Sequence, residues 1–120
     1  MVASITDRLR EDRDRFVGFA FANADLLLEL DSASRIQWAG GAVKSILSRD
    51  ADSLINRPLT HILTVQDAAL LMAALRELQP GQRRRGLHMT LHKDDGAGQV
   101  VEVGIYRVLE ASEQRYCLSI

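Results

Sequence analysis

The side chains that could act as nucleophiles or metal ligands are few in this chain and widely spaced. It has one cysteine, Cys117, and three histidines, His61, His88 and His92. His88 and His92 lie four residues apart in a segment that alternates like a strand, so they would share a face without being adjacent. Zinc normally takes three or four ligands, and only Cys117 could join these two histidines across a sheet. We therefore predict no metal site.

Two carboxylates, Asp25 and Glu29, interrupt the most apolar run of the chain, residues 24–30. A carboxylate in such a run could serve as a general base if burial raised its pKa. Neither residue has a histidine or tyrosine partner, and the chain carries no phosphate-binding loop or nucleophile–base pair. We expect no catalytic site, and a small stand-alone α+β enzyme that uses Asp25 or Glu29 is the alternative.

Charge and composition narrow the range of partners. The formal net charge is −1, and the basic run at residues 83–85 has no clustered aromatic residues on which bases could stack. No apolar run approaches the roughly 20 residues that span a bilayer, and the N-terminus lacks a signal-peptide pattern. A lone Cys117 rules out an internal disulfide and favours a reducing compartment. We expect a cytoplasmic protein that binds neither nucleic acid nor membrane.

The length of 120 residues and the hydrophobic content of 47% fit one domain, residues 24–120, preceded by a flanking helix, residues 1–23. Ser4 can cap that helix, with Asp7 three positions on. The apolar side chains of the helix fall near one stripe, which must pack on its own sheet, a second copy or a preceding domain. They are Ile5, Leu9, Phe16, Phe19 and Ala20.

The next segment reads as a β-hairpin followed by short helices. Residues 26–31 and 35–39 are the predicted strands, joined by a turn at residues 31–34 in which Asp and Ser can bond local backbone. Alternation places Leu28 with Leu30 on one face, and Ile36 with Trp38. Short helices are predicted over residues 42–48, 54–55 and 58–63, and Asn56 tolerates the left-handed conformation that ends such turns.

A longer helix and three strands complete the prediction. Thr64 caps the helix with Asp67 three positions on, and Pro80-Gly81 stops it. Its apolar positions are Leu70, Leu71, Met72, Leu75 and Leu78. The strands cover residues 84–93, 99–109 and 114–120, with an Asp-Gly hairpin loop at residues 94–98 and a turn at residues 111–113. One antiparallel sheet covered on one face by the middle helices is the expected α+β fold.

This order of elements resembles a PAS domain over residues 24–120. The resemblance rests on pattern: a Leu-rich strand ending in Asp31, then Ile36 and Trp38, then Ala42 with Ile46-Leu47. Residues 59–63, Asp67 at the head of the long helix, and the final hairpin and strand continue the match. Many relatives carry Gly where Ser48 and Asn56 stand, and Asn where Gly40 stands.

The resemblance implies a five-stranded sheet and a helical insert that together enclose a pocket. In relatives this pocket holds haem, a flavin, a small metabolite or nothing. A haem ligand would have to be His61, since the long helix has no histidine, and flavin photochemistry would need a helical cysteine, whereas Cys117 lies in the last strand. We expect neither cofactor. The candidates for lining a pocket are Leu28, Trp38, Ile46, Leu63, Leu71, Met72, Leu75, Met89 and Leu91, although most of them could equally be plain core.

The resemblance also implies a function. PAS domains are regulatory sensor or dimerisation modules, and relatives sit upstream of histidine kinases or of enzymes that make or break cyclic dinucleotides. We predict a module of a larger bacterial signal-transduction protein, coupled to a downstream output domain. The N-terminal helix often mediates dimerisation in relatives, so we expect a homodimer formed through the outer sheet face and through Ile5, Leu9, Phe16 and Phe19.

Overall fold

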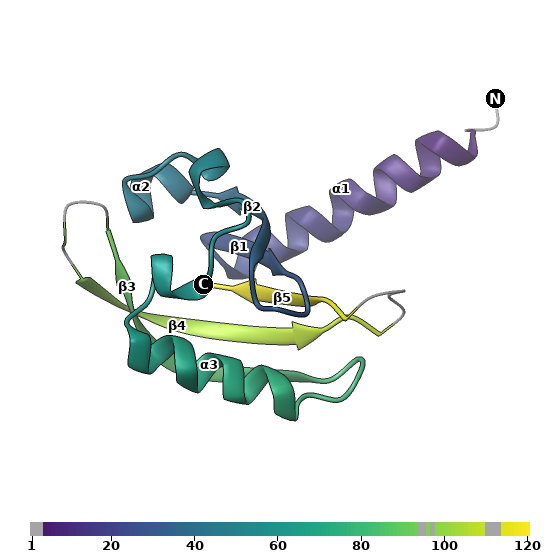
Figure 1. Ribbon diagram of the computed structural model, residues 1–120. Helices are drawn as coiled ribbons and strands as arrows, with labels where there is room; N and C mark the ends of the chain where they lie inside the picture. The colour runs from purple at the N-terminus through teal and green to yellow at the C-terminus, as the bar shows by residue number, and fades with distance from the viewer. Residues whose placement is uncertain (1–3, 94–95, 97, 110–113) are drawn as a thin grey trace.

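The fold is a single antiparallel sheet of five strands with helices against it, as the computed structural model of the chain shows in Figure 1. The structure describes residues 4–93, 96, 98–109 and 114–120. The strand order β2-β1-β5-β4-β3 confirms the predicted sheet and makes β5 its centre. The elements are α1 (Ile5–Asn23), β1 (Leu26–Leu30), β2 (Ile36–Gly41), α2 (Val43–Leu47), η1 (Ala51–Leu54), η2 (Leu59–His61), α3 (Val65–Glu77), β3 (Arg83–His92), β4 (Gly98–Arg107) and β5 (Tyr116–Ser119).

Two predicted loops fall largely outside the described residues. Most of the Asp-Gly hairpin loop at residues 94–98 and the turn at residues 111–113 belong to this part of the chain. The strands on both sides of each loop lie within two residues of their predicted bounds.

Both long helices begin at the predicted caps. The Ser4 hydroxyl accepts a hydrogen bond from the Asp7 amide at 3.1 Å, and the Thr64 hydroxyl accepts one from the Asp67 amide at 3.0 Å. Each bond satisfies an amide that has no partner inside its helix. The start of α1 and of α3 is therefore encoded locally.

The β1–β2 hairpin contains a bulge that corrects one prediction. Leu26, Leu28 and Leu30 point into the core as the alternation predicted, but the register shifts after Glu29, so that Leu30 pairs with Ile36 while Glu29 pairs with Trp38. A bulge adds one residue to one strand and moves the following side chains to the other face. Trp38 is therefore 46% exposed on the outer face, and the prediction that it shares a face with the buried Ile36 is wrong.

The turn before the bulge is held by one carboxylate. Asp31 Oδ1 accepts hydrogen bonds from the backbone amides of Ala33 and Arg35, each at 2.9 Å, and Asp31 Oδ2 accepts one from the side-chain Nε2 of Gln37 at 3.1 Å. Such Asp-to-backbone bonds are what the turn sequence predicts. They fix the point at which the chain reverses between β1 and β2.

Leucine side chains from one sheet face and from the helices form the core. Leu71 and Leu75 of α3 are buried against it, and the half-buried Met72 packs at its margin. Leu70, predicted with the apolar positions of this helix, is instead 65% exposed. It lies about 100° around the helix from Leu71, beyond the width of the buried stripe.

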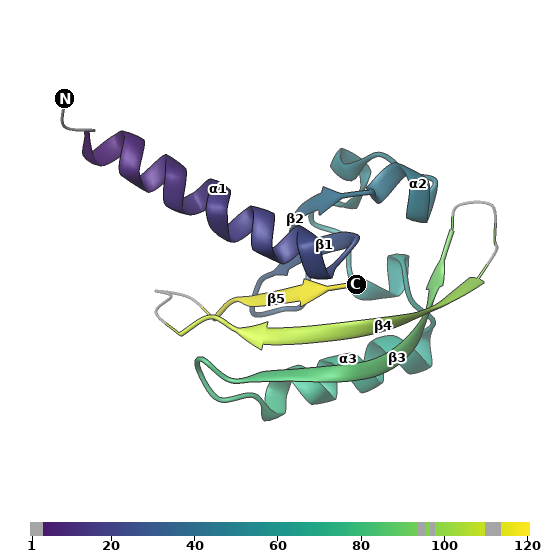
Figure 2. The same cartoon turned by 180° about the vertical axis from the view of Figure 1, so that it is seen from behind.

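Side-chain and backbone bonds attach the helices to β3 and β4. Asp67 Oδ2 accepts a hydrogen bond from the Thr90 amide at 2.8 Å, and the Ile62 carbonyl accepts one from the His92 amide at 2.8 Å. At the other end of α3, Arg107 Nη1 donates to the Leu78 carbonyl at 3.0 Å. These bonds fix α3 along β3 and β4, on the front of the sheet in Figure 1 and behind it in Figure 2.

Ser48 and Asn56 both end short helical turns in the left-handed conformation, with φ of 57° and 64°. Asn56 confirms the prediction made for it. A side chain on such a residue meets the backbone sterically, so glycine would adopt either position with less strain.

Candidate functional site

The predicted pocket-lining side chains divide into a core group and a marginal group. Leu28, Leu63, Leu71, Leu75, Met89 and Leu91 are each at most 5% exposed and belong to one continuous hydrophobic core. Ile46 and Met72 are half-buried at its margin, and Trp38 lies outside it on the outer sheet face. Met89 also borders a groove of about 270 Å³ between α3 and β3.

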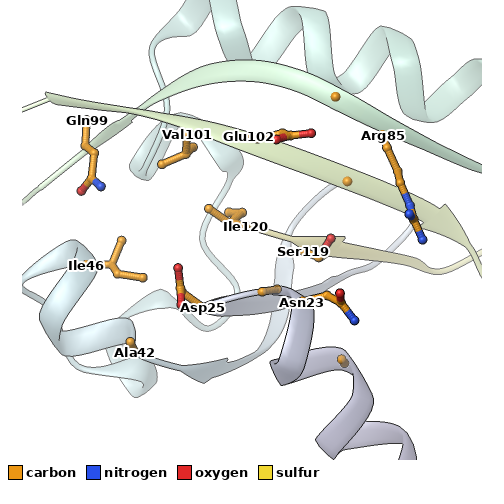
Figure 3. Close-up of a pocket in the computed structure, with 14 residues that line it drawn as sticks. Asn23, Asp25, Ala42, Ile46, Arg85, Gln99, Val101, Glu102, Ser119 and Ile120 are labelled. Atoms are coloured by element: carbon orange, nitrogen blue, oxygen red, sulfur yellow. The ribbon is translucent and has the colours of Figure 1, made fainter.

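A larger cavity of about 840 Å³ opens beside the end of β5, where the sequence gave no indication of one (Figure 3). The start of β1 and helix α2 form one side of it, with Asp25, Ala42 and Ile46. Strand β4 forms the opposite side, and the last residues of the chain lie between the two. Ile46 is the only predicted pocket residue among those that line it.

The lining of this cavity combines apolar side chains with three charged ones. Val101, Ile46 and Ile120 supply the apolar part, and Asp25, Arg85 and Glu102 supply the charges. No ion pair within 4 Å links Arg85 to either carboxylate among the interactions of the described residues, so all three can meet an occupant. The lining is therefore mixed, with apolar and charged side chains around the same space.

Sequence reasoning missed the β4 side of the cavity, although a signal existed. The predicted strand over residues 99–109 is longer than the final strand over residues 114–120 that pairs with it. Pairing in the structure ends at Gly104 with Ser119, while β4 begins at Gly98. A difference in strand length therefore indicates an unpaired stretch, but only once the sheet order is known.

The outer face of the sheet carries a row of side chains that crosses all five strands. Registers pair Trp38 with Glu29, Glu29 with Cys117, Cys117 with Tyr106, and Tyr106 with Arg83. Neighbouring side chains in such a row contact each other. Trp38, Tyr106 and Cys117 are exposed, so this row presents two aromatic rings and a thiol to the outside.

The electrostatics of this row centre on Cys117. Desolvation by the surrounding sheet raises the pKa of its thiol above the ordinary value, the Glu29 carboxylate raises it further, and Arg115 opposes the change. Arg115 forms an ion pair with Glu29 at 3.3 Å. A thiol with a raised pKa holds its proton at neutral pH and is a weak nucleophile.

Helix α1 projects away from the sheet (Figures 1 and 2), and the side chains of its apolar stripe are exposed. Ile5, Leu9, Phe16 and Phe19 are each 65–77% exposed, whereas Phe21 near the end of the helix is half-buried. Packing of the stripe on the chain's own sheet, one of the three alternatives, is therefore wrong. The other two alternatives, a second copy or a preceding domain, stay predictions.

The stripe has a regular spacing and one charged member. Residues 5, 9, 12, 16 and 19 alternate by four and three positions, so they align along one side of a helix with about 3.6 residues per turn. The charged member is Asp12, which pairs with Arg15 at 3.2 Å. Its carboxylate divides the apolar stripe into two halves.

The remaining residues considered for catalysis or metal binding do not come together in the structure. Asp25 is exposed, and Glu29 is half-buried and ion-paired, so the premise of a buried general base is wrong for both. Cys117 cannot join His88 and His92, because β4 lies between their strands and neighbouring strands are about 4.8 Å apart. The described residues contain no group of three metal-ligating side chains.

The three arginines of the basic run point to different surroundings. Arg83 belongs to the outer row, Arg84 approaches Glu77 of α3 at 3.8 Å, and Arg85 lines the cavity. They therefore form no common basic patch. In the part of the chain that the structure covers, no helix is both long and apolar enough to cross a membrane.

Together these features define a small α+β domain whose helical insertion between β2 and β3 covers one sheet face while the other face stays open. The chain belongs to the PAS-fold family, since the family model described as PAS fold matches residues 21–118. The resemblance drawn from the sequence is thereby confirmed. No curated protein matches the chain.

Solved structures agree on the fold. The PAS domain of an HTR-like protein from Haloarcula marismortui has a TM-score of 0.75 at 21% identity, with 95% of this chain and 93% of that chain covered. A domain of a sensory box sensor histidine kinase/response regulator from Geobacter sulfurreducens has a TM-score of 0.67 at 15% identity, with 92% and 95% covered. These identities are low, so the similarity concerns the fold alone.

Proposed function

We propose that the chain is a regulatory sensor and dimerisation module of a larger signal-transduction protein, such as a histidine kinase or a cyclic-dinucleotide enzyme. Membership in the PAS-fold family supports this, as do fold neighbours described as parts of sensor histidine kinases. The module has no catalytic activity of its own in this proposal. Robust turnover of ATP or of cyclic dinucleotides by the isolated chain would contradict it.

The observation that carries the proposal is the pair of uncovered surfaces in one molecule. The stripe on α1 and the outer row of the sheet are both exposed, and α1 projects away from its own sheet. Each large apolar side chain contributes roughly 1.5–3 kcal/mol when buried. A homodimer in which these surfaces cover each other gives a signalling protein two subunits whose relative shift can pass to a downstream domain.

Sedimentation velocity tests the dimer. We expect the intact chain to be a dimer at tens of micromolar, and we expect both Phe16→Glu and a chain that lacks residues 1–19 to be monomers. Gly18→Glu is the matched control, because it adds the same charge about 160° around α1, where an added Cβ has nothing within 4 Å. A monomeric intact chain, or a Phe16→Glu variant that stays dimeric, would show that the stripe is not the interface.

We further propose that the module works without haem or flavin and that any ligand in its core is small and uncoloured. The supporting observations are that Cys117 lies on the outer face and that α3 contains no histidine. Absorbance and native mass spectrometry of the purified protein test this together. A Soret or flavin band that survives gel filtration would refute it. Loss of a Soret band in His61→Ala would identify His61 as the residue that binds the haem iron.

A further inference from the structure

Strand β3 lies at one edge of the sheet, and part of this edge has no partner strand (Figure 2). Main-chain groups of an antiparallel strand point alternately to its two sides. The Thr90 amide donates to Asp67 and the His92 amide donates to the Ile62 carbonyl, so both amides point away from β4. By the same alternation, the amide and carbonyl of His88 also point outward. No hydrogen bond among those of the described residues satisfies them there.

The groove of about 270 Å³ between α3 and β3 runs beside this edge. Its apolar lining comes from both elements, with Leu70, Ala73 and Ala74 from α3 and with Leu87 and Met89 from β3. Leu70 is 65% exposed, although it is a large apolar side chain on the helix that covers the core. The groove is smaller than the roughly 300–1,000 Å³ of pockets that enclose small-molecule ligands. Its size and the open main-chain groups beside it suit a short peptide.

The open stretch of the edge is short. On one side of His88, the next outward amide is that of Thr90, which is already bound. On the other side, the register of β3 with β4 shifts between Arg84 and Leu87, where a bulge displaces the strand. One residue of an added strand can therefore exchange main-chain bonds with His88, and its two neighbours then stand opposite Leu87 and Met89.

The charges beside the open edge are mainly positive. Of the side chains that line the groove, Arg84 and His88 are basic and Glu77 alone is acidic, at 3.8 Å from Arg84. Arg83 stands on the other face of the strand, in the outer row, and no ion pair among the described residues involves Arg83 or His88. Pairing of β3 with the β3 of a second copy would bring the arginines of both strands together, and like charges repel. An acidic segment complements this edge instead.

From this geometry we propose that the groove binds a short extended segment of a partner protein, with the pattern apolar–acidic–apolar, which adds to the edge of β3 as an antiparallel strand. Exposed sheet edges bind peptides in this way, with main-chain bonds for affinity and side-chain pockets for specificity. The central residue pairs with His88, and its acidic side chain stands on the outer face of the sheet. The two apolar side chains enter the groove and cover Leu70.

This site is distinct from the surfaces assigned to the dimer. The groove opens on the side of the sheet that α3 covers, whereas the outer row lies on the opposite face and the stripe lies on α1. A monomeric chain should therefore bind the segment as a dimer does. Failure of the proposed dimer in sedimentation leaves this site unaffected.

Titration of the intact chain with a synthetic peptide tests the site. The probe is Asp-Leu-Glu-Leu-Asp with an acetylated N-terminus and an amidated C-terminus. We expect saturable shifts of the Leu87, His88 and Met89 amide signals in nitrogen–proton correlation spectra. At saturation, hydrogen exchange at the His88 amide should slow by about tenfold or more, since a paired amide must open before it exchanges. The absence of a saturable shift at peptide concentrations up to about 1 mM would overturn the proposal.

Two altered peptides separate strand pairing and charge from plain apolar contact. N-methylation of the central Glu removes the amide that donates to the His88 carbonyl but keeps every side chain, so the affinity should fall by about tenfold or more. The peptide Lys-Leu-Lys-Leu-Lys keeps both leucines and reverses the charge, so it should bind more weakly than the probe, most clearly at low salt. If either peptide binds as tightly as the probe, the proposal is wrong.

Variants of α3 locate the bound peptide. Leu70→Asp should weaken binding of the probe by about tenfold or more, because it replaces the apolar contact in the groove with a carboxylate. Val65→Asp is the matched control, since Val65 is also exposed on α3, at 75%, but does not line the groove. Unchanged binding in Leu70→Asp, or an equal loss in Val65→Asp, would overturn the proposal. So would exchange at His88 that slows with protein concentration when no peptide is present, because a second copy would then occupy the edge.

Discussion

Asp67 offers the sharpest test of how the helical insert is held against the sheet. Its amide is bound by the Thr64 cap, and its carboxylate accepts the Thr90 amide of β3 at 2.8 Å across 23 residues of sequence. The acidic side chain also lies in the first turn of α3, where negative charge is favourable. One residue thus accepts a main-chain hydrogen bond from the edge strand β3 and lies at the start of the helix that covers the core.

Asp67→Ala should destabilise the domain by about 1.3–4 kcal/mol, the sum of two costs. Leaving the partly buried Thr90 amide without a partner costs about 1–3 kcal/mol, and losing the charge at the helix start costs about 0.3–1 kcal/mol. Asp67→Asn keeps the size and an oxygen acceptor but not the charge, so it should cost less than about 1 kcal/mol. The Thr64 cap is unchanged in both variants.

Urea unfolding followed by circular dichroism measures both changes, with the comparison restricted to variants of equal denaturant slope. The experiment belongs in the Phe16→Glu background, because dimerisation would add stability that depends on protein concentration. If Asp67→Ala costs no more than Asp67→Asn, the bond to Thr90 contributes nothing and the reasoning fails. Loss of β3 edge protection in hydrogen exchange at Thr90 would support it independently.

Three further predictions concern single positions. Asp12→Leu removes the charge from the apolar stripe and should tighten the proposed dimer by about tenfold or more in sedimentation equilibrium; no change would show that residue 12 faces away from the partner. Because the pKa of Cys117 is raised, its alkylation should become rapid only at higher pH than for a free cysteine. Glu29→Gln should shift that pH profile down and Arg115→Gln should shift it up, and equal profiles would contradict the assigned causes. Ser48→Gly should stabilise the domain by about 0.5–1 kcal/mol relative to Ser48→Ala, measured by urea unfolding, since φ at this position is 57°; equal stability of the two variants would show that the left-handed conformation carries no strain.

The elements of this fold could be predicted where the signal is local. Caps at Ser4 and Thr64 fix the helix starts, and alternation in residues 84–93 fixes the face of β3, because each depends on neighbours within a few residues. The turn at Asp31 belongs to the same class. These features need no knowledge of the rest of the molecule, so the sequence alone was sufficient.

The errors arise where a distant partner decides the outcome. The bulge beside Glu29 depends on how β1 pairs with β2, and alternation over a five-residue strand cannot reveal it. The stripe of α1 did not reveal its direction, and Figure 1 shows that the helix projects away from the sheet. The cavity beside β5 depends on two strands of unequal length becoming neighbours, which is a property of the sheet order.

The misassigned Trp38 changes the interpretation of the outer face. Alternation placed its ring in the core, which would leave the outer face of β2 without a large side chain. The bulge instead sets the indole over Gly40, where an added Cβ would overlap with the ring, and in line with Cys117 and Tyr106 across the sheet. The outer row exposes two aromatic rings, and the projecting helix exposes Phe16 and Phe19. Exposing both apolar surfaces to water is costly. The two surfaces together therefore support an interface more strongly than the apolar stripe of α1 could alone.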